Sequence, residues 1–358
     1  MADFIMFPVT LCALVAVLMV LAGGVINPNV WWVPAFVILG APLIYLLYII
    51  ATAYWVLRWN LFVAIPMAVV MLFAVWNVGA FVQVRFWKAY QEKSGDQLRV
   101  MSYNVHCFNF ENQSYETHLN DVVGFINSSK PDVICLQEFM PIANDTTARM
   151  ANLFAQWPYF VAMMGGSSPG TGFGTVIFSR YPMTVTQRVL SDSATGGALG
   201  VELYVEGDTI NLFNCHLQTT SFNAVNNEQG LRALFASDHS TALARTTTRL
   251  MRDSFMIRAV QADSVAAQIA RCSYPLVVVG DLNSVPLSYT YHTVRASMKD
   301  AFVASGLGYG YTYRPMSKLL RIDYAFYDDN QYECLNYVSP DLPYSDHNPI
   351  VVTLKKKI

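Results

Sequence analysis

Charged residues are scarce in this chain and unevenly distributed. They make up 13% of the 358 residues, about half the share of a typical soluble protein, whereas hydrophobic residues make up 54%. No Asp, Glu, Lys or Arg lies between Asp3 and Arg58, and none lies between Arg58 and Arg85. Such long uncharged stretches exclude an ordinary soluble start to the chain. They indicate a membrane region followed by a soluble region.

Motifs that would define several other protein classes are also missing. The six cysteines form no CxxC pair, so neither a zinc site nor a redox pair is indicated. Cys135 and Cys215 lie within strand-like runs, where a free thiol behaves as a small hydrophobic group. No Gly-Lys-Ser/Thr occurs, which excludes a nucleotide-binding P-loop.

The soluble region lacks the basic stripe of a nucleic-acid-binding protein. Four of the 23 Lys and Arg residues and two of the 25 acids precede residue 95, which leaves 19 against 23 and a net charge of −4. The only basic run is Lys355–Lys357 at the C-terminus. Binding to a polyanion normally requires a positive footprint, so the balance weighs against duplex nucleic acid as a partner without excluding it.

Three apolar runs in the first part of the chain each approach the ~20 residues that span a bilayer. They are Phe4–Ala22, Trp31–Trp55 and Leu61–Val82. A cleavable signal peptide is an alternative for the first run, but that run lacks a basic start and two more runs follow it. We therefore expect three transmembrane helices in an integral multi-pass membrane protein, with the lipid bilayer as a partner.

The charges near these runs give opposing topology signals. Arg58 lies in the short second loop and favours a soluble domain outside the cytoplasm, whereas Arg85 and Lys88 favour the reverse. A long soluble domain is translocated largely regardless of nearby charge. We therefore expect the soluble domain to be extracytoplasmic.

The pattern divides the chain into a membrane region (1–89), a linker (90–97) and a soluble domain (98–358). Helices are predicted at Thr117–Ser128 and Arg249–Arg271 from apolar residues at helical spacing. Short apolar runs bounded by Gly, Asn, Asp or Pro predict strands that are covered on both faces. These strands are Leu98–Tyr103, Val133–Gln137, Thr175–Ser179, Thr209–Cys215, Leu276–Val279, Asp323–Tyr327 and Ile350–Leu354. The order of elements predicts a layered α/β sandwich.

Two further segments of the soluble region allow more than one interpretation. Ser221–Thr248 is polar and follows His216 closely, so it is either a surface insertion or a lid or membrane-facing loop beside a site. Gly166–Gly170 matches the GxSxG pattern of serine hydrolases, but a strand follows it where that pattern requires a helix. We interpret it as a glycine-rich loop.

Four short clusters at the ends of strands carry acids, an amide and an imidazole. They are LQE (Leu136–Glu138), GDLN (Gly280–Asn283), RIDY (Arg321–Tyr324) and SDH (Ser345–His347). A single strand-end acid is most often a turn or helix-cap residue. If their strands are neighbours, however, Glu138 and Asp281 would lie close together at one end of the sheet. Their carboxylates could then bind Mg²⁺, which prefers oxygen ligands. Asn283 is alternate to Asp281 and would face the same way.

Two histidines accompany these acids. His347 follows Asp346, and a carboxylate such as Asp323 can fix its tautomer and raise its basicity, as a general base requires. His216 ends another strand. Any one histidine is usually a surface or core residue, but two beside acid-bearing strand ends favour a catalytic site.

Taken in order, these segments resemble the endonuclease/exonuclease/phosphatase superfamily. The resemblance rests on SYNV (Ser102–Val105), LQE, GTVIFSRYP (Gly174–Pro182), HLQT, GDLN, RIDY and SDHNP, and covers about Leu98–Leu354. It implies a deoxyribonuclease-like two-sheet α/β sandwich with a site at the sheet edge. Several nucleases of the group have an acid two residues after the first Asn, where this chain has His106.

The resemblance also implies roles for individual residues. Mg²⁺, with Mn²⁺ as the alternative ion, would be bound by Glu138, Asn104 and Asp346. Asp281 and Asn283 would bind or activate at the scissile phosphate. His347, oriented by Asp323, would act as a base or as a phosphate-stabilising imidazolium, with His216 as the second active-site histidine.

We therefore expect a membrane-anchored, Mg²⁺-dependent phosphoric ester hydrolase. Its substrate is a lipid or another small phosphate ester, cleaved as a diester or a monoester. The alternative is a Mg²⁺-dependent endonuclease or exonuclease acting on DNA or RNA. A non-catalytic binding protein on the same fold is disfavoured because no expected acid or histidine is missing.

Overall fold

The structure is a computed structural model that describes residues 2–85, 97–112, 114–141, 149, 152–165, 172–190, 197–220 and 240–357. The glycine-rich loop Gly166–Gly170, the linker up to residue 96 and residues 221–239 of the polar segment lie outside this range. The chain forms two compact units. One comprises Met1–Val82, Thr220–Ala259 and Ser284–His292, and the other comprises Gln83–Thr219, Val260–Asn283 and Thr293–Ile358.

The first unit contains the apolar helices. They are α1 (Ala2–Gly23), α2 (Val33–Val37), the 3₁₀ helix η1 (Ile38–Gly40), α3 (Ala41–Leu57) and α4 (Leu61–Val78). Two stretches, Ala2–Gly23 and Val33–Leu57, are long and apolar enough to cross a membrane, with mean hydropathies of 2.8 and 2.3. The apolar stretch Leu61–Val75 of α4 is shorter. Two of the three expected spans therefore have the required length, and the third apolar stretch is too short to pass the same test.

An ion pair connects the start of α1 with the end of α3. Arg58 follows α3, and its Nη2 lies 2.8 Å from Oδ2 of Asp3 at the start of α1. Tyr54 donates a hydrogen bond to the same carboxylate at 2.5 Å. Because the start of α1 meets the end of α3, the two helices run antiparallel, as expected for consecutive spans.

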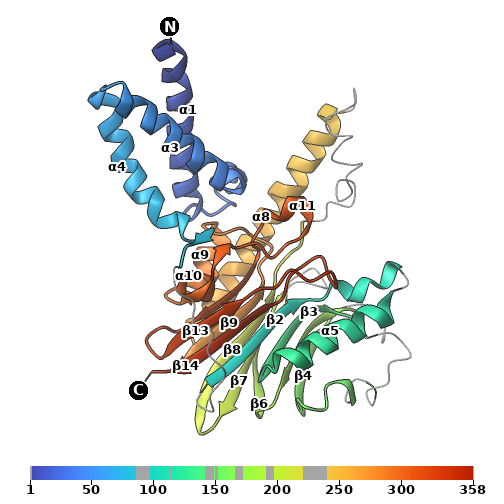
Figure 1. Ribbon diagram of the computed structural model, residues 1–358. Helices are drawn as coiled ribbons and strands as arrows, with labels where there is room; N and C mark the ends of the chain where they lie inside the picture. Colours follow the sequence, from blue (N-terminus) through green and yellow to red (C-terminus); the bar gives the residue numbers. More distant parts are fainter. Residues whose placement is uncertain are drawn as a thin grey trace. The chain divides into compact units, whose positions relative to one another are not determined.

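The second unit is built on two six-stranded mixed sheets (Figure 1). The strand order is β13-β14-β2-β3-β5-β4 in the first sheet and β10-β12-β9-β8-β7-β6 in the second. The first sheet consists of β2 (Gln97–Asn104), β3 (Val133–Phe139), β4 (Tyr159–Met164), β5 (Gly174–Ser179), β13 (Tyr332–Val338) and β14 (Ile350–Lys356). The second consists of β6 (Met183–Leu190), β7 (Gly197–Val205), β8 (Asp208–His216), β9 (Leu276–Asp281), β10 (Lys299–Asp300) and β12 (Asp323–Tyr327).

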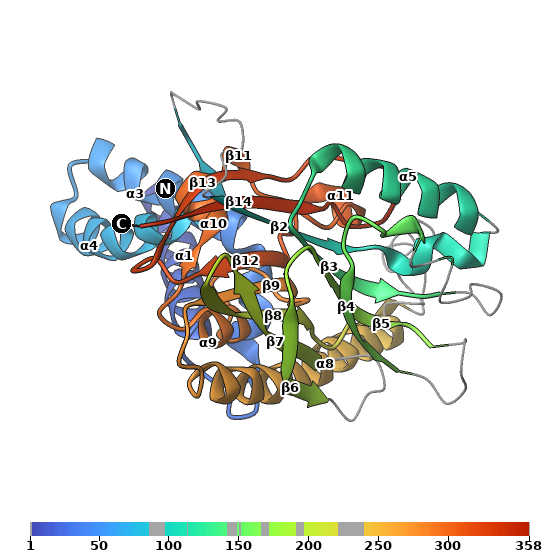
Figure 2. The same ribbon diagram turned by 90° about the horizontal axis from the view of Figure 1, so that it is seen from below.

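A helix covers the outer face of the first sheet. Figure 2 shows α5 (Tyr115–Ser129) against this sheet, and the end of α8 (Ser240–Ile269), from Val260 on, belongs to the same unit. The remaining elements are η2 (His106–Asn112), α9 (Tyr289–Arg295), α10 (Ala301–Ser305), α11 (Pro315–Lys318) and the short strands β1 (Val82–Gln83) and β11 (Gly308–Tyr309). Residues 240–248 of the polar segment form the start of α8 and are therefore helical, not part of a loop.

The side chains along each strand alternate between the two faces of its sheet, which explains how the sheets and helices are layered. In β2, Val100 packs in the core between the two sheets, whereas Met101 and Tyr103 pack in the core beneath α5. Successive side chains of a strand point to opposite faces, so a strand between two apolar cores must be apolar on successive residues. The predicted α/β sandwich with strands covered on both faces is confirmed. All seven predicted strands and both predicted helices are present.

Candidate active site

The strand ends bring the predicted site residues of both sheets together. In the second sheet β8 and β9 are parallel and place His216 opposite Asp281, while the antiparallel β12 places Asp323 opposite Asp281 as well. In the first sheet β2 and β3 are parallel and pair Asn104 with Gln137, the residue before Glu138. Parallel neighbours end at the same edge of a sheet, which is why residues distant in sequence meet here.

Asn104 joins the two sheets at this edge. Its Nδ2 donates to Oε1 of Glu138 at 3.2 Å and to Oδ2 of Asp281 at 3.1 Å. Its Oδ1 accepts from the backbone N–H of His106 at 3.0 Å. The side chain is buried and both ends of its amide are used, so its orientation is fixed.

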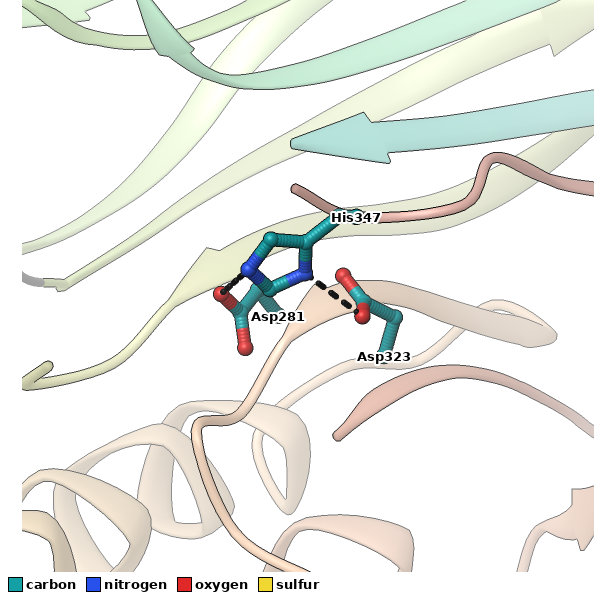
Figure 3. Close-up of side chains that lie close together, drawn as sticks. All are labelled: Asp281, Asp323 and His347. Atoms are coloured by element: carbon teal, nitrogen blue, oxygen red, sulfur yellow. Dashed lines mark hydrogen bonds and ion pairs between the residues drawn. The ribbon is translucent and has the colours of Figure 1, made fainter. Parts of the chain in front are cut away.

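His347 lies between two buried carboxylates (Figure 3). Its Nδ1 is 2.8 Å from Oδ2 of Asp323, and its Nε2 is 3.7 Å from Oδ2 of Asp281. Burial lowers the pKa of His347, but Asp323, Asp281 and Asp346 outweigh burial and raise this pKa well above its usual value. Burial and the nearby Asp323 raise the pKa of Asp281. The neighbouring carboxylates therefore favour the protonated form of His347.

Glu138 occupies a bulge at the end of β3. The pairing of β3 with β5 shifts register between Leu136 and Phe139, and Glu138 has a left-handed φ of 50°. Its Oε1 lies 3.4 Å from Nε2 of the buried His216. Burial alone would raise the pKa of Glu138, but His216, His347 and the Asn104 amide lower it to about 2. The nearby histidines and the Asn104 amide therefore favour the ionised form of Glu138.

Asn283 meets Asp281 through a turn. The strand β9 ends at Asp281, and the backbone N–H of Asn283 donates to Oδ1 of Asp281 at 2.7 Å. The Asn283 Nδ2 donates to Oδ2 of Asp281 at 3.2 Å and to the carbonyl of Leu217 at 3.0 Å. The expected proximity is confirmed, but the reason given for it is wrong. A turn with a left-handed Asn283, φ 49°, brings the two together, not strand alternation.

Asp346 has a partner that its sequence context did not indicate. Its Oδ1 lies 2.8 Å from Nδ1 of His106, and both side chains are partly exposed. The contact with Asp346 is the main cause that raises the pKa of His106. Burial would raise the pKa of Asp346, but His347 and His106 lower it. The residue that departs from the acid of related nucleases thus contacts a predicted metal ligand.

Several supporting residues were also missed from the sequence. Ser345 donates through Oγ to the carbonyl of Asn104 at 2.8 Å and accepts from the N–H of His347 at 3.2 Å. Thr312 Oγ1 accepts from the N–H of Asp323 at 3.0 Å. The ring of Tyr313 packs edge-on against His347 with centroids 5.1 Å apart. The SDH cluster contained Ser345, but nothing in the sequence around Thr312 or Tyr313 signals the site.

The donors at this edge suit a divalent cation. Glu138 and Asp346 supply carboxylate oxygens, the ligands that Mg²⁺ prefers, and both carboxylates are partly open to solvent. Asn104 turns its amide nitrogen towards Glu138 and its oxygen towards the N–H of His106, so it would bind an ion through oxygen only after its amide turned over. Ligand atoms of Asp281, Asp323 and His347 also lie within 4.8 Å of one another. Both nitrogens of that imidazole already face carboxylates, so this buried trio suits proton transfer better than metal binding.

Comparison with known proteins identifies related folds. The family model described as "Endonuclease/Exonuclease/phosphatase family" matches residues 101–347. An endonuclease/exonuclease/phosphatase from Beutenbergia cavernae is 21% identical, with a TM-score of 0.51 over 73% of this chain and 72% of that one. Truncated TDP2 from Caenorhabditis elegans is 16% identical, with a TM-score of 0.49 over 74% and 100%. The human nocturnin catalytic domain, solved with bound sulfate, is 18% identical, with a TM-score of 0.48 over 76% and 98%. A search of curated proteins finds no match.

Proposed function

Because the chain belongs to the endonuclease/exonuclease/phosphatase family, we propose that it is a membrane-anchored, Mg²⁺-dependent phosphoric ester hydrolase. Enzymes of this family cleave phosphoester bonds and generally use divalent metals. The observation that carries the proposal is the single cluster of Asn104, Glu138, His216, Asp281 and His347 at the joint edge of both sheets. This cluster contains a cation site and a proton-transfer group side by side.

The residues divide into two groups of different chemistry. Glu138, with Asn104 and Asp346, would hold Mg²⁺, which supplies positive charge for the phosphoryl and leaving oxygens. Asp323 fixes the tautomer of His347 through Nδ1. Because three carboxylates raise the pKa of His347, its imidazolium form can donate to a phosphoryl oxygen through Nε2.

Asp281 is then the better candidate for the base. Its raised pKa brings it nearer the working pH, which is what general base catalysis requires. Asn283 holds one oxygen of this carboxylate through its backbone N–H, and Asn104 approaches the other. Asp281 would accept the proton of the attacking water while His347 stabilises the negative charge on the phosphate.

The membrane anchor favours a substrate held at or near a bilayer. We propose α1, α3 and α4 as the anchor, residues 90–97 as the linker and residues 98–358 as the catalytic domain. A lipid or another small phosphate ester fits this arrangement better than chromosomal DNA, because residues 95–358 carry a net charge of −4 and polyanions favour a positive surface. A reporter fused to the C-terminus and assayed on both sides of the membrane tests the proposed extracytoplasmic location.

A substrate panel tests the activity of the full chain in detergent. The panel contains a generic phosphodiester, a phosphomonoester, phospholipids, inositol phosphates and plasmid DNA, each with Mg²⁺ and with a chelator. We expect Mg²⁺-dependent hydrolysis of a small or lipid ester that Glu138→Ala and His347→Ala abolish. Nicking of plasmid alone would favour the nuclease alternative. Folded protein that cleaves none of these would refute the proposed function.

A further inference from the structure

Two amide side chains meet in the core between the two sheets. Gln137 lies on β3 of the first sheet and Asn214 on β8 of the second, and both are fully buried. Gln137 Nε2 donates to Oδ1 of Asn214 at 2.6 Å. Each residue adjoins the candidate site, because Gln137 precedes Glu138 and Asn214 is two residues before His216.

The amide nitrogen of Asn214 reaches two backbone carbonyls of the opposite sheet. It donates to the carbonyl of Leu136 on β3 at 3.0 Å and to that of Val176 on β5 at 3.0 Å. Leu136 and Val176 are the last pair before the register shift between β3 and β5. The side chain of Asn214 therefore binds the start of the bulge that contains Glu138.

This arrangement solves an energetic problem created by the bulge. A left-handed conformation at a non-glycine residue such as Glu138 costs on the order of 1–3 kcal/mol and persists only when its surroundings enforce it. Each hydrogen bond to the backbone before the bulge typically contributes ~0.5–1.5 kcal/mol to keeping it in place. Asn214 supplies donors to both carbonyls, and its own oxygen is satisfied by Gln137.

We propose that Asn214 is a positioning residue for the metal site. It holds the β3 bulge in the conformation that directs the Glu138 carboxylate towards Asn104 and His216, and the Gln137–Asn214 hydrogen bond fixes the spacing of the sheets at this edge. The same strand carries His216, whose Nε2 lies 3.4 Å from Glu138 Oε1. The inference rests on the proposed function in assigning Glu138 to Mg²⁺.

If Asn214 only filled the core, its replacement would have a different effect. It would lower stability but leave the affinity for Mg²⁺ unchanged in the protein that remains folded. Asn211 provides a matched control because it lies on the same strand β8, is buried, and donates to a backbone carbonyl, that of Tyr274, at 3.1 Å. It lies near the start of β8, and His216 ends that strand.

The test compares Asn214→Leu with Asn211→Leu in the full chain. Thermal melts establish the folded range, and calorimetric titration with Mg²⁺ below it measures affinity. We expect both variants to melt earlier, and only Asn214→Leu to bind Mg²⁺ about 10- to 100-fold more weakly, as for other residues that orient metal ligands. Should Asn214→Leu fail to fold, Asn214→Ser and Asn211→Ser repeat the comparison with smaller perturbations. Unchanged affinity in the Asn214 variant, or equal loss in both, would overturn the proposal.

A structural measurement separates this proposal from the proposed function. If the wild-type chain binds no Mg²⁺, the metal assignment fails, but the conformation of Glu138 can still be read from a crystal structure of the Asn214 variant. We expect Glu138 to leave the left-handed region and to lose its contacts with Asn104 and His216. Retention of φ near 50° and of both contacts would show that Asn214 does not position Glu138.

Discussion

His347 Nδ1 lies 2.8 Å from Oδ2 of Asp323, and this contact links two segments that the sequence separates by 24 residues. Asp323 is the first residue of β12, and the hydroxyl of Thr312 anchors its backbone N–H. The contact fixes which imidazole nitrogen carries a proton and leaves Nε2 facing Asp281. The orientation of the imidazole therefore depends on one buried carboxylate.

Asp323→Asn is expected to impair catalysis much more than folding. The amide keeps the size of the carboxylate but removes its charge, so the imidazole loses its fixed tautomer and its stabilised proton. Loss of correctly arranged acid–base catalysis typically lowers kcat by about 10²- to 10⁴-fold. Steady-state kinetics on the best substrate of the panel measure the effect, with Asp328→Asn, directly after the far end of β12, as the control. Similar kcat values for the two variants would argue against the assigned role.

The stability of the protein is expected to fall as pH rises above neutrality, partly because of His347. Its pKa in the folded state is raised above the usual value of about 6.5, so the folded state binds the proton more tightly than the unfolded state. The resulting stabilisation is fully present below the unfolded value and is lost as pH rises through the folded value.

His347→Gln removes this proton-linked stabilisation. Its melting temperature should therefore change less with pH than that of the wild type across the neutral to alkaline range. Thermal melts at a series of pH values make the comparison, with His118→Gln on α5, outside the candidate site, as the control. A wild-type profile parallel to that of His347→Gln would exclude a raised pKa for this histidine.

Hydrophobic runs were sufficient to locate the strand-end acids. Val277–Val279 before Asp281 and Val133–Leu136 before Glu138 are buried on both faces, and such runs mark central strands whatever their partners. The longer strands β4, β6, β7 and β13 were missed. Three of them, β4, β6 and β13, are edge strands, and their conformation depends on pairing with a neighbour, which local sequence does not encode.

Contacts between distant segments could not be predicted either. His106 and Asp346 meet only because β14 pairs with β2, and this register is set by long-range pairing. The left-handed conformation of Glu138 likewise depends on a bulge and on Asn214 of the other sheet. Such features follow from tertiary structure, so the sequence identified the chemical groups of the site but not the geometry that orients them.

Gly280→Ala is expected to destabilise the domain strongly. Gly280 precedes Asp281 and has a φ of 133°, and a Cβ atom there would lie 2.0 Å from the carbonyl oxygen of Cys215. Backbone atoms of a paired strand cannot move aside cheaply, so the clash adds to roughly 1–3 kcal/mol of conformational strain. Chemical or thermal unfolding measures the change.

Gly207→Ala separates the effect of the steric clash from the effect of the backbone strain. Gly207 also has a positive φ, 94°, but no atom lies within 4 Å of the Cβ position. This variant should therefore show the strain alone and lose less stability than Gly280→Ala. Equal losses would mean that the close approach of β8 and β9 at Gly280 is unimportant.

The cysteines are expected to differ widely in reactivity, and Cys215 can report on the site. Burial raises the pKa of Cys215 to about 12 and raises that of Cys135 further, so neither thiol forms the reactive thiolate in the folded protein. Cys107 and Cys272 are only partly buried. Among the cysteines outside the apolar helices, timed labelling with a maleimide at neutral pH, read by peptide mass spectrometry, should modify these two first. Because Cys215 is next to His216 on β8, its labelling requires β8 to open at the site. Labelling of native Cys215 as fast as Cys272 would show that this strand end is not held as the structure describes.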